Sequence, residues 1–335
     1  MYFYMKSTIV LKNYLYIISF QIVSSRFFDI CLSGPRSDND ASLVKLLKEK
    51  FLDWPSKLPY NLSTDAKYLL EMQHSSMQTI KALLLLLLDD RKGGFFVEAG
   101  ALDGQYVSNT LWLEKDLNWT GLLIEPDPYN FKELKSKQRK AWISNSCISV
   151  TPYPKKVVFK SLKRPSSTEA LNWVYRGNSH IKDIPLGWQI ENTSEITYRK
   201  VQCFPLHTYL LALNRTHIDF LSLDTQGGEA DILRRFPWNK ITVEIVIIEH
   251  IDMEGLIDKE IIKFMNANNF ILFALTAEPD YLFLNKHSDL YKSYKHETVQ
   301  SVLDKDNALY DNQEYYAGDM LQMEFIKGNK AVRIY

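Results

Sequence analysis

The sequence predicts a doubly wound α/β fold with a mostly parallel sheet, and three patterns support this prediction. After Gly93-Gly94, short segments rich in β-branched and aromatic residues alternate with helical segments. Such alternation is typical of a parallel sheet with helices on both faces. Helical periodicity before Gly93 predicts a preceding pair of helices, and two apolar segments on either side of Glu278-Pro279-Asp280 predict an antiparallel hairpin. The 335 residues suit one elaborated domain of this class, although two smaller domains also fit.

The composition excludes several classes of protein. The 40 Lys and Arg residues balance the 40 Asp and Glu residues, whereas a dedicated nucleic-acid binder is usually strongly basic. Hydrophobic residues make up 46% of the chain and charged residues 24%, which is the balance of a folded globular protein. The three cysteines form no Cys-x-x-Cys motif, so the sequence predicts neither a structural metal site nor a thioredoxin-like pair.

Residues 1–25 have the pattern of a secretory signal. Lys6 and Lys12 precede an apolar stretch from Tyr14 to Val23, and the small residues Ser24 and Ser25 follow it. The stretch is shorter than the ~20 residues that cross a bilayer, so we expect a signal peptide or a truncated signal-anchor. Both predict entry into the secretory pathway. A frayed amphipathic end of a cytoplasmic protein is the alternative.

Four glycosylation sequons and one pair of cysteines fit exposure to a secretory lumen. The sequons begin at Asn61, Asn118, Asn192 and Asn214, although a chain of this composition would contain some by chance. In an oxidising lumen, Cys147 and Cys203 are candidates for a disulfide. The interpretation that we favour from sequence is that both are small buried hydrophobic residues beside strands.

We expect residues 26–92 to form the helical pair. Apolar residues recur at helical spacing between Ser37 and Asp53, and again from about Asp65 to Leu88. The six leucines from Leu83 to Leu88 are too few to span a membrane, because charged residues stand close on either side. They are predicted to lie in the core.

Residues 93–290 are expected to form the α/β domain. The predicted strands are Phe95–Ala99, Gly121–Glu125, Trp142–Ser149, Ile218–Asp224 and Val243–Glu249. The predicted helices between them are Ser108–Lys115, Tyr129–Lys140 and Gly228–Phe236. The hairpin pairs Ile271–Leu275 with Tyr281–Leu284. Residues 291–335 show little pattern and are predicted to be an irregular tail.

The turn after the first predicted strand is the main candidate for a ligand site, because ligands bind at the carboxyl ends of strands in open parallel sheets. Gly100 and Gly104 allow a tight turn and close approach to a ligand, and Ser108 and Asn109 open the next helix. Glu125 ends the second strand, where a carboxylate can bind both hydroxyls of a ribose.

Charge in this turn favours S-adenosylmethionine over a dinucleotide. The turn lacks the Gly-x-Gly-x-x-Gly spacing that places a pyrophosphate on a helix N-terminus. Asp103 lies in the turn and Glu98 near the end of its strand. Carboxylates here would repel a pyrophosphate but suit the ammonium group of a methionine moiety.

Three further residues are candidates for catalysis at the same edge of the sheet. Asp224 ends the fourth strand and Glu229 lies in the first turn of the next helix, where either can orient an acceptor hydroxyl or take its proton. Glu229 is equally an ordinary acid favoured by the helix dipole. His250 follows the fifth strand, and we weigh a general base against the more common histidine bonded to backbone.

The motifs together resemble the FkbM-type methyltransferase domain, and within it the arthropod Star-like proteins. An acid followed by Gly-Ala, then Gly and Ser, falls on Glu98, Gly100, Ala101, Gly104 and Ser108. The Star-like branch resembles the chain through VEAGALDG, SNTLWLEK and the segment Trp119–Pro126. A later Asp-x-Gln-Gly-x-Glu motif falls on Asp224, Gln226, Gly227 and Glu229. Leu102 departs from the family pattern, because a small or polar residue usually stands there, and its bulk is expected to narrow the methionine site.

The resemblance implies two functions. The first is a methyltransferase that uses S-adenosylmethionine, with transfer to an oxygen. The second, implied by the Star-like branch, is a non-catalytic, membrane-associated protein that moves growth-factor (EGF receptor) ligands as cargo through the secretory pathway. The compartments that this function implies are the endoplasmic reticulum, the Golgi and the endosome.

A basic stretch is a separate candidate for binding a partner. Ten Lys and Arg residues and one acid, Glu133, lie between Lys132 and Arg164. A solvated helix face and loop is the ordinary explanation, and an anionic membrane surface or an acidic partner is the functional one. No aromatic stacking pattern supports nucleic acid.

Overall fold

The computed structural model describes residues 34, 36–66, 68–69, 77–163, 176–184, 195–249, 258–276 and 280–293. The main sheet has seven strands, namely β1 (Phe95–Ala99), β2 (Thr120–Ile124), β3 (Trp142–Ser144), β8 (His217–Leu223), β9 (Thr242–Glu249), β10 (Phe270–Leu275) and β11 (Asp280–Asn285). Their order is β10-β11-β9-β8-β1-β2-β3, with β9 to β3 all parallel. The predicted mostly parallel α/β sheet is confirmed.

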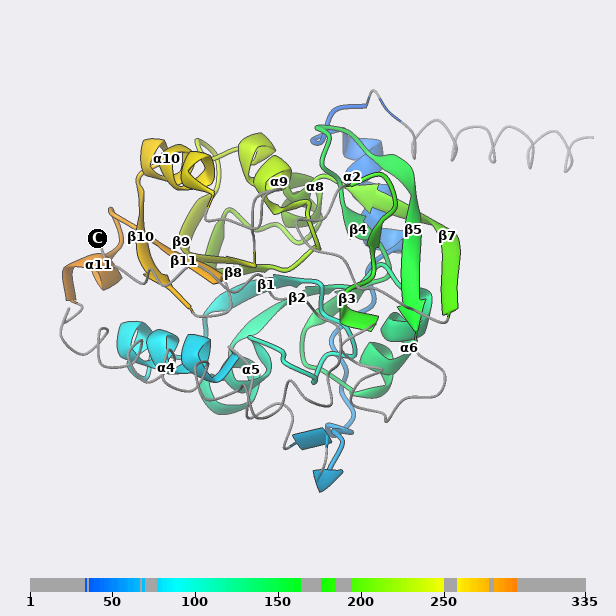
Figure 1. Ribbon diagram of the computed structural model, residues 1–335, viewed down its shortest axis with the longest axis horizontal. Helices are drawn as coiled ribbons and strands as arrows, with labels where there is room; N and C mark the ends of the chain where they lie inside the picture. The colour runs from blue at the N-terminus through cyan, green and yellow to red at the C-terminus, as the bar shows by residue number, and fades with distance from the viewer. Residues whose placement is uncertain are drawn as a thin grey trace, which may run out of the picture.

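Helices cover both faces of this sheet (Figure 1). One face packs against α4 (Met77–Leu88) and α5 (Leu111–Leu117). The other packs against α2 (Ala41–Lys50), α8 (Leu206–Ala212), α9 (Glu229–Arg235) and α10 (Lys259–Ala267). The two-residue period of β1 serves both layers, because Val97 faces one apolar cluster and Phe96 the other.

The leucine-rich helix is part of the core, as predicted. Leu83, Leu84, Leu87 and Leu88 are buried in α4, and Phe96 of the sheet packs in the same cluster. No helix in the described ranges has both the length and the hydropathy to cross a bilayer. Residues 1–25, with the predicted signal, lie outside those ranges.

The closing hairpin is confirmed with one refinement. β10 and β11 pair antiparallel, and β11 also pairs antiparallel with β9. β11 therefore inserts between its predecessor and the parallel strands. The predicted irregular tail begins with the short helix α11 (Asp289–Ser293), and residues 294–335 are outside the described ranges.

A second sheet lies beside β3, and the sequence did not predict it. It consists of β4 (Cys147–Ile148), β5 (Lys155–Lys163), β6 (His180–Ile181) and β7 (Glu195–Phe204), in the order β4-β7-β5-β6. The predicted strand Trp142–Ser149 is therefore wrong as one element. Its first residues pair with β2 in the main sheet and its last with β7 in the small one.

The two cysteines of the small sheet form a disulfide. Cys147 and Cys203 are directly opposite each other on β4 and β7, with their Cα atoms 4.2 Å apart. Both are buried, in a cluster with Phe159 and Val201. The favoured interpretation as unlinked hydrophobic residues is thus corrected, because the pairing of two distant strands brings the thiols together.

A charged cluster lies at the edge where the parallel strands begin. The Asp219 carboxylate accepts a hydrogen bond from the backbone N–H of Phe95 at 2.8 Å and pairs with Arg91 at 2.7 Å. His217 lies 3.3 Å from Asp219 and 3.7 Å from Glu244. The hydrogen bond to Asp219 raises the pKa of His217.

This cluster predicts a stability that depends on pH. The pKa of His217 in the folded protein lies above its value of ~6.5 in the unfolded chain. Its contribution to the free energy of unfolding is therefore complete below pH ~6.5 and is lost as the pH rises through the folded pKa. We expect His217→Gln to lower the free energy of unfolding at pH 5.5, by less than about 1 kcal/mol because the pair is partly exposed, and to have little effect at pH 9. Denaturant titrations at both pH values test this, with the exposed His287→Gln as control. Equal losses at both pH values would contradict it.

Candidate functional site

The candidate site is built where three neighbouring parallel strands end. The turn after β1 touches the turn after β8 at Gly100, whose φ is +87°. A Cβ atom at this position would lie 1.9 Å from the carbonyl oxygen of Asp224. Asp224 in turn donates its backbone N–H to the carbonyl of Ala99 at 3.0 Å. Only glycine permits both the backbone conformation and this approach.

The turn is also bonded to Glu125, just past the end of β2. One carboxylate oxygen of Glu125 accepts the backbone N–H of Leu102 at 2.9 Å, and the other accepts that of Asp127 at 2.8 Å. Burial, with the nearby charge of Asp127, raises the pKa of Glu125 to about 8. The glycine turn and the acid predicted to bind a ribose therefore lie side by side.

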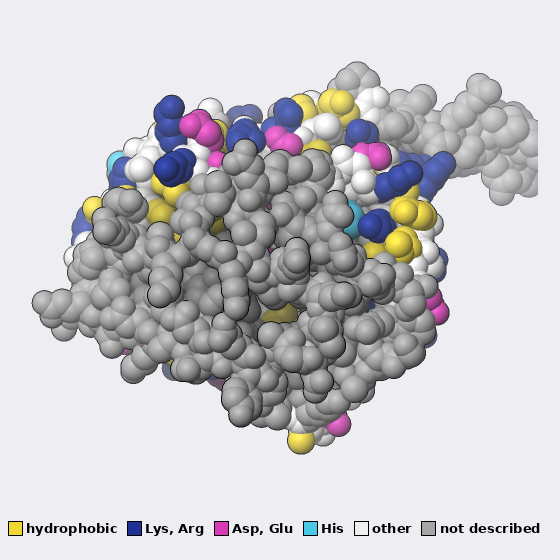
Figure 2. Space-filling view, in the orientation of Figure 1, with side chains coloured by type: hydrophobic (Ala, Val, Ile, Leu, Met, Phe, Trp, Pro, Cys, Tyr) yellow, Lys and Arg dark blue, Asp and Glu magenta, His cyan; other side chains and the backbone are white. Residues whose placement is uncertain are grey.

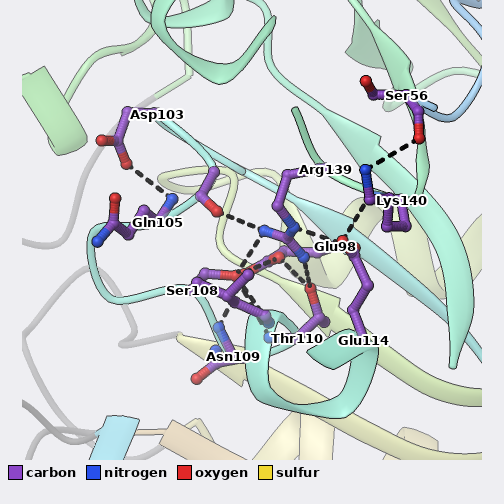
Figure 3. A network of polar contacts seen from close by, with 12 residues as sticks. Ser56, Glu98, Asp103, Gln105, Ser108, Asn109, Thr110, Glu114, Arg139 and Lys140 are labelled. Carbon is purple, nitrogen blue, oxygen red and sulfur yellow. Dashed lines mark hydrogen bonds and ion pairs between the residues drawn. The ribbon is translucent and has the colours of Figure 1, made fainter. Parts of the chain in front are cut away.

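Glu98 organises the turn from inside (Figure 3). Its carboxylate accepts hydrogen bonds from the hydroxyls of Ser108 at 2.9 Å and Thr110 at 2.5 Å, and from the backbone N–H of Asn109 at 2.9 Å. Burial raises the pKa of Glu98, while the positive charge of Arg139 acts in the opposite direction. Every one of these contacts ties β1 to the start of the following helix.

Arg139 completes this buried network. Its guanidinium pairs with Glu114 of α5 at 3.0 Å, and both side chains are fully buried. It also donates to the hydroxyls of Ser108 at 3.2 Å and Thr110 at 3.0 Å, and to the carbonyl of Gly104. One cation therefore links α5, the turn and the segment that follows α6 (Pro128–Ser136).

Asp103 is neutralised within the protein. One carboxylate oxygen accepts the backbone N–H groups of Gln105 and Tyr106 at 2.9 and 2.7 Å. The other accepts the Tyr68 hydroxyl at 2.8 Å and pairs with Lys137 at 3.1 Å. These partners already balance the negative charge of Asp103. Its contact with a cofactor stays a prediction.

Leu102 points into a small apolar cluster. Its backbone has a positive φ of +49°, and its side chain is buried against Tyr68, with Leu69 and Tyr106 beside them. The positive φ directs the side chain into this cluster while its N–H bonds Glu125.

Asn109 offers an acceptor atom with no partner. Its side-chain amide donates to the hydroxyl of Ser222 on β8 at 3.1 Å. Its Oδ1 atom is buried and has no hydrogen-bond partner among the described residues. A buried acceptor of this kind is costly unless a donor reaches it.

Asp224 is the candidate base with the most suitable surroundings. It is partly buried, and Gln226 donates its amide to one carboxylate oxygen at 2.6 Å and to Glu249 at 3.2 Å. Burial, with the charge of Glu229 adding to it, raises the pKa of Asp224 to about 6. A hydrogen bond with Glu249 acts in the opposite direction.

Glu229 holds the turn between β8 and α9. One carboxylate oxygen accepts the backbone N–H and the hydroxyl of Thr225 at 2.5 and 2.8 Å, and the other accepts the N–H of Gly227 at 3.0 Å. Glu229 is fully buried. The third candidate, His250, lies outside the described residues.

Comparison with known proteins identifies the family. The family model for the methyltransferase FkbM domain matches residues 98–272, just over half of the chain. The chain belongs to the FkbM methyltransferase domain family. No curated protein matches the sequence, so the relation to the Star-like branch stays a prediction.

Sequence reasoning missed the cations that hold the candidate site together. Lys137 and Arg139 were expected on a solvated helix or loop, yet both are buried. Arg176, from the segment between β5 and β6, donates to Asn130 at 2.8 Å, and Asn130 lies 3.4 Å from Glu125. No sequence pattern marks a cation as buried. The excess of positive charge close to several acids at strand ends was the one feature from which buried ion pairs could have been predicted.

The basic stretch divides between two tasks. Lys135 pairs with Asp53 at 2.8 Å, whereas Lys137 and Arg139 pair with Asp103 and Glu114 at the candidate site. Lysines of β5 lie instead on the small sheet, where Figure 2 shows basic and hydrophobic side chains together at the upper right. Binding of a membrane or an acidic partner stays a prediction for that sheet, and Arg164 lies outside the described residues.

The buried network predicts a large cost for removing Arg139. We expect Arg139→Met to lower the free energy of unfolding by about 3–5 kcal/mol, because it leaves the Glu114 carboxylate buried without its cation. The double variant Arg139→Met/Glu114→Leu should lose less than the sum of the single losses. Denaturant titration of the four proteins measures the coupling, and strictly additive losses would contradict the pairing.

Proposed function

We propose that this FkbM domain transfers a methyl group from S-adenosylmethionine to an oxygen atom. The observation that carries the proposal is the meeting of three strand ends: the turn at Gly100 contacts Asp224 on one side and is bonded to Glu125, through Leu102, on the other. Family membership supports a methyltransferase-like function independently of this geometry.

The residues at the turn fit the chemistry of the cofactor. The Oε2 atom of Glu125 uses one lone pair on the backbone N–H of Leu102 and keeps the other for a ribose hydroxyl, whereas Oε1 accepts from both Asp127 and Asn130. The unpartnered Oδ1 of Asn109 is an acceptor for the ammonium group of the methionine moiety. When bound, S-adenosylmethionine supplies an electrophilic methyl group on a sulfonium.

Glu98 and Asp103 support the site from behind in this proposal. Their carboxylates are occupied by the turn itself and by Lys137, so they are positioning residues that fix the backbone of Gln105, Tyr106 and Asn109. This differs from the sequence-based prediction, in which both carboxylates face the ammonium group directly.

Asp224 is the proposed base, and Glu229 is proposed to position it. Burial raises the pKa of Asp224, which makes its carboxylate more basic than that of an ordinary aspartate. It accepts the proton of the acceptor hydroxyl as that oxygen forms its bond to the methyl group. Glu229 shapes the turn that presents Asp224 and makes no contact with substrate.

We also propose that the protein works in an oxidising compartment of the secretory pathway. The Cys147–Cys203 disulfide supports this, because disulfides persist in secreted and luminal proteins and are rare in the cytosol.

Binding of the cofactor product tests the role of Glu125. We expect Glu125→Gln to raise the Kd for S-adenosylhomocysteine about tenfold, the loss expected for about one hydrogen bond to the ribose. Calorimetric titration measures it, with Glu133→Gln on α6 as the matched control. Unchanged affinity in a folded Glu125→Gln protein would exclude the ribose role.

Methyl transfer tests the role of Asp224. We expect Asp224→Asn to lower the rate of transfer about 10²- to 10⁴-fold while leaving the Kd for S-adenosylhomocysteine within about threefold, because the lost function is proton transfer. The rate of the unmodified protein should rise with pH through about 6, as the base loses its proton.

The assay uses methyl-labelled S-adenosylmethionine with a panel of sugar and polyol hydroxyls, and counts label that survives alkali, since ethers survive and esters do not. A rate that is independent of pH between 5 and 7, or an undiminished Asp224→Asn enzyme, would overturn this assignment.

A further inference from the structure

Two sequons occupy equivalent places in the fold. Asn118 follows the end of α5 and precedes β2, and Asn214 follows α8 and precedes β8. Both have left-handed backbones, with φ of +54° in each case. Each sequon therefore spans a connection from a helix to a parallel strand.

The middle residue of each sequon anchors it to the start of β1. Trp119 is buried, donates its indole N–H to the carbonyl of Arg91 at 2.8 Å, and packs so close to Gly94 that a Cβ atom there would lie 2.6 Å from its ring. Arg215 lies over the ring of Phe95, 4.4 Å from its centroid. The two sequons thus flank one strand at the same edge of the sheet.

The acceptor groups of both sequons face solvent. Asn118 and Thr120 are exposed, and so are Asn214 and Thr216. Within the described residues, neither side-chain amide has a hydrogen-bond partner. In contrast, the amide of Asn61 donates to the carbonyl of Ser136 at 3.2 Å.

We infer that Asn118 and Asn214 carry N-linked glycans. In each, the side-chain nitrogen forms a bond to the first sugar of a lipid-linked oligosaccharide, loses one proton to the transferase, and displaces the lipid pyrophosphate. The inference rests on the proposed secretory compartment, which the Cys147–Cys203 disulfide supports independently.

The position of the glycans keeps the methyl-transfer site open. Both asparagines lie where the parallel strands begin, whereas the turn at Gly100 lies where they end. β1 has five residues between these edges, a length of roughly 17 Å at ~3.3 Å per residue. The glycans would cover the edge that holds Asp219 and leave the opposite edge uncovered.

Electrophoretic mobility of the full chain from eukaryotic cells tests the inference. Treatment with an endoglycosidase should increase mobility, and Thr120→Ala and Thr216→Ala should each increase it by one glycan before treatment. The double variant should lose two. Thr120→Ser and Thr216→Ser keep the hydroxyl that the transferase requires, so both should migrate like the unmodified protein. The Thr→Ala variants leave each left-handed asparagine in place and change only an exposed side chain.

Alkylation of free thiols in the same samples separates the two proposals. If Cys147 and Cys203 are protected from alkylation and mobility is unchanged in both Thr→Ala variants, glycosylation is overturned and the proposed oxidising compartment is retained. Reactive Cys147 and Cys203 with unchanged mobility would overturn both. Binding of S-adenosylhomocysteine, measured separately, depends on neither result.

Discussion

The ion pair between Arg139 and Glu114 is the constraint on which the site depends. It is fully buried, and the same guanidinium bonds the hydroxyls that bind Glu98. The carboxylates of Glu114 and Glu98 would be costly to bury without the cation, and burying the guanidinium of Arg139 would be costly without the carboxylates. The shape of the glycine turn is therefore set by electrostatics beneath it, before any ligand is considered.

Contact between the turns is the second constraint. The carbonyl oxygen of the neighbouring turn lies so close to Gly100 that a Cβ atom would not fit between them. Glu229 fixes that neighbouring turn through hydrogen bonds from Thr225 and Gly227. Acids that look like catalytic candidates in sequence thus divide into two groups. Glu98 and Glu229 bond the backbone of the turns, whereas Glu125 and Asp224 lie at the edge of the sheet, and one oxygen of Glu125 keeps a lone pair.

The sequence predicted the central strands well and the small sheet not at all. Phe95–Ala99 is found with its predicted bounds, and the ends of β2, β8 and β9 lie no more than one residue from the predicted ends. The reason is that a continuous apolar run bounded by polar residues leaves few possible positions for the ends of a strand. β5 and β7 mix lysines with apolar residues, and they are partners that lie far apart in the sequence. Likewise, proximity of the turn to Glu125 followed from strand order, whereas the burial of Arg139 depended on side-chain packing that a linear pattern does not encode.

The disulfide turns residues 147–203 into a covalent ring that contains β5 and β6. A ring closed across 56 positions restricts the unfolded chain and stabilises the native one by about 4 kcal/mol on the chain-entropy model. Cleavage of the backbone inside the ring would leave both pieces attached to the domain. The small sheet is therefore closed twice, by this covalent bond between β4 and β7 and by the antiparallel pairing of β5 with β7.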